Sequence, residues 1–65
     1  MNKKIYIVMC YTIYNGDFPY YIESTWTSQR KAINRQNELN SDKRKKWRED
    51  HNYGIFSIEE QWISK

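Results

Sequence analysis

Two runs of strand-forming residues open the chain, and the pair Asn15-Gly16 separates them. Residues 3–14 and 18–26 are rich in β-branched and aromatic side chains, which is typical of strands. Asn-Gly readily adopts the positive φ angles that a two-residue type I′ turn requires. The pattern therefore predicts a hairpin in which the numbers of opposite residues add to 31.

This register divides the hairpin side chains between the two faces of a sheet. One face is nearly all apolar, and the other mixes polar with aromatic side chains. Because one face of an antiparallel sheet is commonly packed on the core, we expect a helix to cover the apolar face. The predicted core, with the helix and a last strand included, is Ile5, Ile7, Met9, Tyr11, Ile22, Trp26, Ala32, Ile33, Leu39, Phe56, Ile58 and Trp62.

A helical region follows the hairpin. Thr27 or Ser28 is a suitable N-cap, and residues with helical spacing continue toward Trp47. The inner stripe is only weakly apolar, so we expect firm docking over residues 32–39 and a looser end after residue 40, with 40–42 offering a place for a break. Gly54 suits a left-handed position that ends the helical region.

The lengths of these segments predict a topology. Residues 55–63 form the third expected strand, and a helix that leaves the second strand returns the chain to the other end of the sheet. The third strand then lies beside the first, while Pro19 suits an edge strand. The prediction is one small α+β domain over residues 1–65, of ββαβ type, with a three-stranded antiparallel sheet in order 2-1-3 and one helix packed on one face.

The face that this helix leaves uncovered is the first candidate site. It is expected to carry an apolar patch, which a homodimer or a ligand could cover. A solvated surface and a platform on which nucleobases stack are the alternatives. The predicted dimer or ligand face consists of Tyr6, Val8, Tyr21, Ile55 and Ile63.

Charge supplies the second candidate site. The net charge is +3, but residues 30–48 hold eight basic side chains against two acidic ones, so the rest of the chain is mildly acidic. A basic helix attracts an acidic protein surface or a phosphate backbone, and it can also be a solvated helix end. The predicted partner-binding residues are Arg30, Lys31, Arg35, Lys45, Lys46, Trp47 and Arg48.

The residue types and their spacing give little support for a catalytic or a metal-binding function. One cysteine and one histidine cannot alone build a zinc site, and no phosphate-binding or dinucleotide glycine motif is present. Cys10 is expected to be a small half-buried strand residue, and His51 an exposed side chain in a polar turn. We therefore predict no catalytic residue, no metal, no cofactor, no membrane contact and a location in the cytoplasm.

Four pieces of the chain carry a resemblance. Residues 5–8, the Asn15-Gly16 hairpin, residues 27–32 and residues 56–60 resemble, in their pattern and over most of the chain, small and mostly uncharacterised ββαβ accessory proteins of bacteriophages and prophages. The resemblance implies a phage-encoded protein that binds and inhibits host enzymes or defence systems, and a location in the host cytoplasm.

These observations lead to one functional expectation and its alternatives. The chain is expected to be a non-catalytic binding module that inhibits or redirects a host protein with an acidic surface. The alternative is a nucleic-acid-binding protein that uses the basic helix over residues 30–48. Sequestration of a small ligand in a dimer groove is a third possibility.

Overall fold

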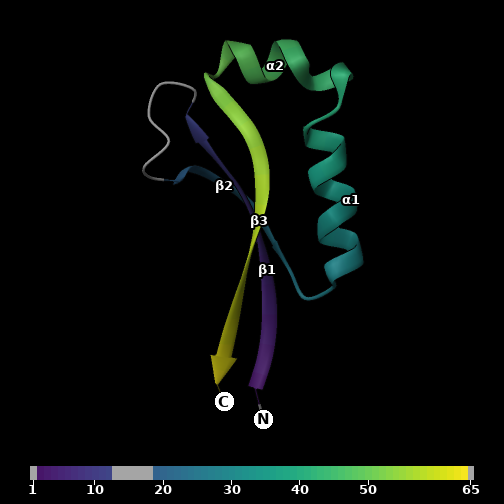
Figure 1. The fold of residues 1–65 in the computed structure, drawn as a ribbon, viewed down its shortest axis with the longest axis vertical. Coiled ribbons are helices and arrows are strands. Elements are labelled where there is room, and N and C mark those ends of the chain that lie inside the picture. Colours follow the sequence, from purple (N-terminus) through teal and green to yellow (C-terminus); the bar gives the residue numbers. More distant parts are fainter. Residues whose placement is uncertain (1, 13–18, 65) are drawn as a thin grey trace.

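The structure of the chain, a computed structural model, describes residues 2–12 and 19–64. Its elements in chain order are the strands β1 (Asn2–Thr12) and β2 (Pro19–Trp26), the helix α1 (Gln29–Leu39), the 3-10 turn η1 (Asp42–Arg44), the helix α2 (Lys45–Asp50) and the strand β3 (Tyr53–Ser64) (Figure 1). The Asn15-Gly16 turn predicted from the sequence lies outside the described residues.

The three strands form one sheet in the order β2-β1-β3, and β1 pairs antiparallel with both neighbours. The predicted α+β class and strand order are therefore confirmed. The prediction of a single helix is wrong, because α1 ends at Leu39 and a separate helix begins after η1. Figure 1 shows α1 running alongside the sheet and α2 crossing near the start of β3.

The ends of the helices follow local rules. Ser28, one of the two N-cap residues that the sequence offered, is the N-cap of α1, and its side chain accepts a hydrogen bond from the Lys31 amide. The break expected at residues 40–42 is also present, since Asn40 caps the C-terminus of α1. The left-handed position before β3 belongs to Asn52, with φ 61°, and not to Gly54. Asparagine tolerates this conformation better than other non-glycine residues do.

The predicted hairpin register holds only in the middle of the β1–β2 pair. Met9 lies opposite Ile22, as expected, but a register shift between Val8 and Met9 leaves Glu23 as an extra residue in β2. Beyond this bulge Trp26 lies opposite Tyr6, where the turn geometry predicted Ile5. One extra residue thus moves Trp26 to the other face of the sheet.

The pairing of β1 with β3 decides which face becomes the core. Phe56 lies opposite Cys10, and Ile58 lies opposite Val8. The helices pack on this face, which we call the covered face. The sequence analysis predicted the reverse assignment. Both faces of β1 carry apolar residues, so β1 alone does not distinguish them, whereas Trp26 and Phe56 both lie on the side of Val8 and Cys10.

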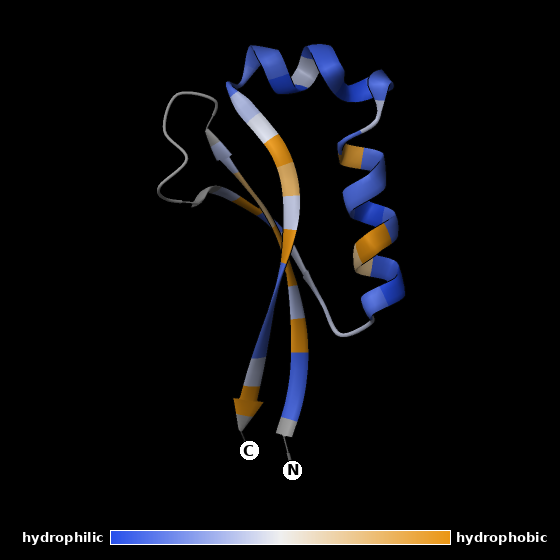
Figure 2. Ribbon diagram, viewed as in Figure 1, coloured by the Kyte–Doolittle hydropathy of each residue, from blue (hydrophilic) through white to orange (hydrophobic). Residues whose placement is uncertain are grey.

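The core is accordingly small and differs from the predicted one. Five buried residues form its centre, namely Val8, Cys10, Ala32, Leu39 and Phe56, and partly buried Tyr6, Trp26, Trp47, Tyr53 and Ile58 pack around them. Of the predicted core residues, Ile22, Ile33 and Trp62 are exposed, while Ile5, Ile7 and Tyr11 are half-buried on the other face. Figure 2 shows why so few helical residues contribute: both helices are mostly hydrophilic, with short hydrophobic bands on α1.

Candidate functional site

Trp47 belongs to an aromatic cluster that holds α2 against β3. Its ring stacks on Phe56 with centroids 5.8 Å apart, and it meets the edge of Tyr53 at 5.2 Å. His51 stacks on Tyr53 at 5.1 Å and shares a hydrogen bond with the Trp47 carbonyl. The Trp47 ring therefore packs against residues of its own chain, whereas the sequence pattern placed Trp47 among the partner-binding residues. Such aromatic pairs add about 0.5–1.5 kcal/mol each beyond area burial.

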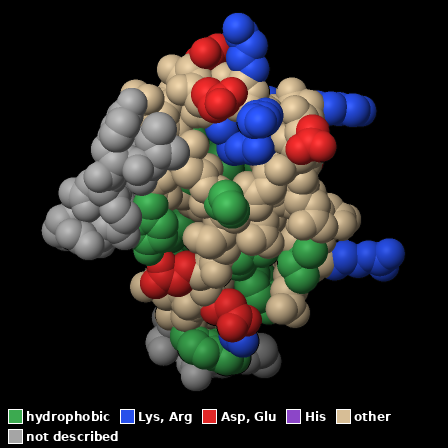
Figure 3. Space-filling view, turned by 45° about the horizontal axis from the view of Figure 1, so that its top comes forward, with side chains coloured by type: hydrophobic (Ala, Val, Ile, Leu, Met, Phe, Trp, Pro, Cys, Tyr) green, Lys and Arg blue, Asp and Glu red, His purple; other side chains and the backbone are tan. Residues whose placement is uncertain are grey.

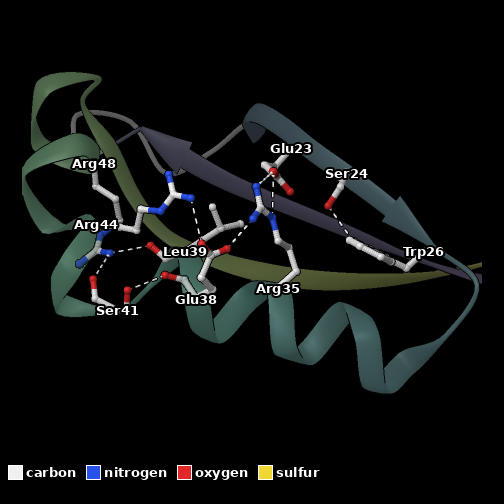
Figure 4. Close-up of polar contacts among 9 residues, drawn as sticks. All are labelled: Glu23, Ser24, Trp26, Arg35, Glu38, Leu39, Ser41, Arg44 and Arg48. Carbon is white, nitrogen blue, oxygen red and sulfur yellow. Dashed lines mark hydrogen bonds and ion pairs between the residues drawn. The ribbon is translucent and has the colours of Figure 1, made fainter.

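Arg48 joins the two helices at the bend between them. Its Nη1 donates to the carbonyl oxygens of Leu39 at 2.6 Å and Ser41 at 2.8 Å (Figure 4). The last carbonyls of a helix have no partner within the helix, so this guanidinium satisfies groups that the end of α1 leaves open. Arg48 is thus a structural residue, whereas the sequence analysis assigned it to the partner-binding surface.

Arg35 is the centre of an ion-pair network that ties α1 to β2. The bulge in β2 brings Glu23 to the covered face, where Arg35 Nε donates to Glu23 Oε2 at 3.0 Å. Arg35 also pairs with Glu38, whose other oxygen accepts from Arg44 Nη2 at 2.9 Å (Figure 4). Neighbouring opposite charges favour the charged forms of Glu23, Arg35 and Glu38. A third predicted partner-binding residue therefore has a structural role.

The electrostatics of this network follow from its hydrogen bonds. The hydrogen bonds from Arg35 hold the pKa of Glu23 below its ordinary value, and Arg44 does the same to the pKa of Glu38. Glu23 in turn raises the pKa of Arg35. The Glu23 side chain is mostly buried, so solvent screens its pairing with Arg35 less than it screens an exposed pair.

We expect the Glu23–Arg35 pair to make the fold sensitive to acid. Because the folded pKa of Glu23 is lowered, its stabilisation is present above the ordinary carboxyl pKa of 4.5 and is lost as the pH falls through the folded value. Urea unfolding at pH 7 and pH 3 measures this loss, which should be smaller in Glu23→Gln than in the parent. Glu59→Gln, at an exposed position of β3, is the control and should keep the parent's acid dependence.

The remaining predicted cations are exposed. Arg30 and Lys31 lie in the first turn of α1, and Lys45 and Lys46 open α2, with Lys43 next to them in η1. None of these five forms an ion pair with another described residue. Acidic side chains of the same segment, Asp42, Glu49 and Asp50, are exposed among the lysines. Figure 3 shows acidic side chains between the basic ones at the upper end of the molecule.

A second surface is the side of the sheet that the helices leave bare, which we call the open face. Met9 lies at its centre and is only 4% exposed, whereas Ile22 and Ile55 at its edges are 58% and 76% exposed. Among the residues with described side chains, its apolar members are Ile5, Ile7, Met9, Tyr11, Ile22, Ile55 and Ile63.

The predicted dimer face is therefore corrected. Tyr6, Val8 and Tyr21 lie on the covered face, where Val8 is fully buried and Tyr21 stacks on Tyr53. Only Ile55 and Ile63 of the predicted set belong to the open face. The cause is the pairing of Phe56 with Cys10, which no local sequence signal specifies.

Two polar side chains of α1 occupy the outer edge of β3, a feature that the sequence analysis missed. The Asn40 amide accepts from the Phe56 N–H at 2.7 Å and donates to the Phe56 carbonyl at 2.9 Å. Gln36 donates to the same carbonyl at 3.1 Å. Asn40 thus makes the two hydrogen bonds that a residue of a neighbouring antiparallel strand would make. The sequence did contain a signal for this contact, because Gln36 and Asn40 are polar residues on the stripe of the predicted helix that faces the sheet.

Cys10 does not have the properties of a reactive thiol. It is fully buried on the covered face, although the predicted register left it on the uncovered side, and burial raises its pKa to about 11. In residues 2–12 and 19–64, no three His, Cys, Asp or Glu side chains gather where they could hold a metal ion. Neither described helix has the length and apolar character that crossing a membrane requires.

We expect Cys10 to react slowly with a disulfide reagent. A pKa of about 11 in place of 9.0 lowers the thiolate fraction at pH 8 roughly 100-fold. Absorbance-monitored labelling of the native protein should therefore be at least this much slower than labelling in urea. Rapid native labelling would show that β1 opens readily or that the thiol is accessible.

The fold and these surfaces define a small α+β domain, in which two helices cover one face of a three-stranded antiparallel sheet and the other face is open and carries both apolar and polar side chains. No protein-family model, curated protein or solved structure was found to match this chain. The resemblance to phage accessory proteins stays a prediction, and the functional argument depends on the geometry of the chain itself.

Proposed function

We propose that this chain is a non-catalytic binding module that occupies the surface of another protein through its open face. The observation that carries the proposal is the exposure of Ile22, Ile55 and Ile63 on that face, whereas the buried cluster and the helices lie on the other side of the sheet. Contiguous apolar patches of this kind mark interaction sites on small proteins. The centres of protein interfaces are likewise depleted in charge and rich in large apolar side chains.

The charges on the molecule indicate a partner with acidic groups around an apolar surface. Lys3 and Glu59 both lie on the open face, so its described charges balance, and the exposed lysines of residues 43–46 supply the positive field. Such a field raises the rate at which an acidic partner arrives. From the resemblance, the proposal takes a host protein that is inhibited or redirected, in the host cytoplasm, as the class of partner.

A nucleic acid is the second choice of partner. The exposed lysines stand among Asp42, Glu49 and Asp50, whose carboxylates would face the phosphates of a backbone bound there. A protein surface with both signs of charge accommodates this mixture, whereas a uniformly anionic backbone does not. The apolar open face also offers no cation other than Lys3 among its described side chains.

The test is affinity capture of the tagged chain from a lysate of the cells in which it is made, with and without nuclease. We compare the parent with Ile22→Glu/Ile55→Glu, which places charges at two exposed positions of the open face. The control is Ile33→Glu, at an exposed position of α1 that is 40% exposed. The proposal expects a stoichiometric protein that survives nuclease and is lost only with the double variant.

Other outcomes contradict the proposal. Recovery that disappears on nuclease treatment supports the nucleic-acid alternative. A partner that is retained by Ile22→Glu/Ile55→Glu does not use the open face. Circular dichroism establishes that both variants fold, and since all three positions are already in contact with solvent, we expect them to.

Electrostatic steering gives a separate expected result once the partner is identified. We expect Lys45→Glu/Lys46→Glu to slow association roughly tenfold at low salt and much less at high salt, because the charges lie outside the contact. Stopped-flow or biosensor kinetics measure the association rate. Lys45→Gln/Lys46→Gln should give about half of this change in the logarithm of the rate, and an unchanged rate at low salt would contradict steering.

A further inference from the structure

The outer edge of β3 divides into a capped part and a bare part. Phe56 directs its N–H and carbonyl away from β1, because Asn40 bonds to both. The pairing of β1 with β3 runs without a shift from Phe56 to Ser64, so the backbone groups alternate regularly along this stretch. Ile58, Glu60, Trp62 and Ser64 therefore direct their N–H and carbonyl groups to the same outer side.

The bare part has no cover among the described residues. Within residues 2–12 and 19–64, no side chain bonds to the outward backbone groups of Ile58, Glu60 or Trp62, and Trp62 is 62% exposed. Beyond Tyr6 the strand β1 has no β2 partner either, so residues 2–5 and 61–64 form a two-stranded ribbon. Figure 1 shows this ribbon extending beyond the first turn of α1, toward the ends of the chain marked N and C.

A two-stranded ribbon with an uncovered edge can be stabilised by pairing with another strand. Two-stranded ribbons are only marginally stable in water, and an edge strand with free backbone groups is a template for pairing. The opposite edge of the sheet is unsuitable, because β2 carries Pro19 and two register shifts. Residues 58–64 of β3 contain no proline, and their pairing with β1 has no register shift.

We propose that two copies of this chain pair antiparallel along residues 58–64 of β3, about a two-fold axis at Gln61, to form a continuous six-stranded sheet. The occupant is a second copy because residues 58–64 can pair with themselves in a register that meets no capped backbone group and places no two glutamates directly opposite each other. Pairing about Gln61 places Glu60 opposite the second copy's Trp62, and Glu59 opposite its Ile63. Four pairs that exchange two hydrogen bonds each would add about eight hydrogen bonds.

Charge and the Asn40 cap together favour this register over those centred on Glu60 or Glu59. An axis at Glu60 or at Glu59 would place two like glutamates directly opposite each other, which is destabilising. Either axis would also bring a residue of the second copy opposite Phe56, whose backbone groups Asn40 already occupies. In the Gln61 register the Glu60 carboxylates stay paired with Lys4, at 3.1 Å within each chain.

The arrangement has a consequence for the open face. A two-fold axis between antiparallel strands is perpendicular to the sheet, so both helical layers lie on one side and both open faces on the other. The dimer would thus present one apolar surface of twice the area. This inference goes beyond the proposed function and does not depend on it, because dimer formation is measured on the chain alone.

The first test is the mass of the purified chain by sedimentation over concentrations up to about 0.5 mM, a range that detects weak association. The expected result is a monomer–dimer equilibrium. Glu60→Pro removes an outward N–H and spares the bonds to β1, so it should raise the dissociation constant at least tenfold. Glu60→Ala, which keeps the N–H, is the matched control and should still dimerise.

Hydrogen exchange of the parent provides a second test that needs no variant. At high concentration the amides of Ile58, Glu60 and Trp62 should become protected, whereas Glu59 and Gln61, which face β1, should be protected at every concentration. A monomer at all concentrations would overturn the proposal. So would a dimer in which the even-numbered amides stay exposed, because that result means association through another surface.

Discussion

Leu39→Ala is expected to destabilise the fold by about 3 kcal/mol, within the range of about 2–5 kcal/mol for deletion of a buried leucine side chain. Leu39 is fully buried and belongs to a centre of only five buried residues. It is also the last residue of α1, immediately before the bend. The cavity would therefore open where both helices and β3 depend on the same side chain.

Chemical unfolding of the parent and the variant measures this difference. Small domains have total stabilities at the low end of about 5–15 kcal/mol, so we expect a partly unfolded population at body temperature. Ile33→Ala is the matched control, because Ile33 lies on the same helix and is 40% exposed. It should cost less than about 1 kcal/mol. Equal losses in the two variants would contradict the assignment of the core.

The second large effect is expected from Asn40→Leu, which keeps the side chain similar in size and removes its hydrogen bonds. The Phe56 N–H then loses the Asn40 acceptor at 2.7 Å, and its carbonyl keeps only the bond from Gln36. Leaving a partly buried backbone group without a partner costs about 1–3 kcal/mol. We expect a loss of about 2 kcal/mol in the free energy of unfolding.

Asn37→Leu is the control for this substitution, since Asn37 is exposed on the same helix. It should change the free energy of unfolding by less than about 0.5 kcal/mol. Hydrogen exchange supplies a local measurement, because the Phe56 amide should exchange faster in Asn40→Leu even under conditions that keep the chain folded. Unchanged exchange at Phe56 would mean that the amide has another acceptor.

The Asn40 side chain also links stability to association. It occupies the edge of β3 at Phe56 and leaves residues 58–64 bare, so it limits how far a second strand can extend. A chain with Asn40→Leu would present a longer edge with more unpaired groups. Loss of this cap is therefore expected to favour pairing in registers that the parent excludes.

Several parts of the fold could be predicted because local sequence is sufficient for them. The strands follow from runs of β-branched and aromatic residues, and the order 2-1-3 follows from the length of the helical segment between β2 and β3. The N-cap at Thr27 or Ser28 and the break over residues 40–42 depend on residues close in sequence. These helix ends are local features, so long-range packing does not change them.

The candidate site could be predicted only in part. Four of the predicted cations are exposed as expected, namely Arg30, Lys31, Lys45 and Lys46. A helix that packs its apolar stripe on the sheet leaves the residues on its opposite side in contact with water. Arg35 and Arg48 lie on the same basic helices, yet they bond to Glu23 and to the end of α1. Sequence spacing does not distinguish the two groups, because the partners come from other segments.

By itself the sequence determined the three strands, their order, the start of the helical region and the excess of positive charge over residues 30–48. The tertiary structure decided which face of the sheet is buried, because that choice depends on one bulge at Glu23 and on the pairing of Phe56 with Cys10. Both faces of β1 are apolar enough to form a core, so only the long-range register selects between them. The open face and the bare edge of β3, which carry both proposals, are consequences of that register.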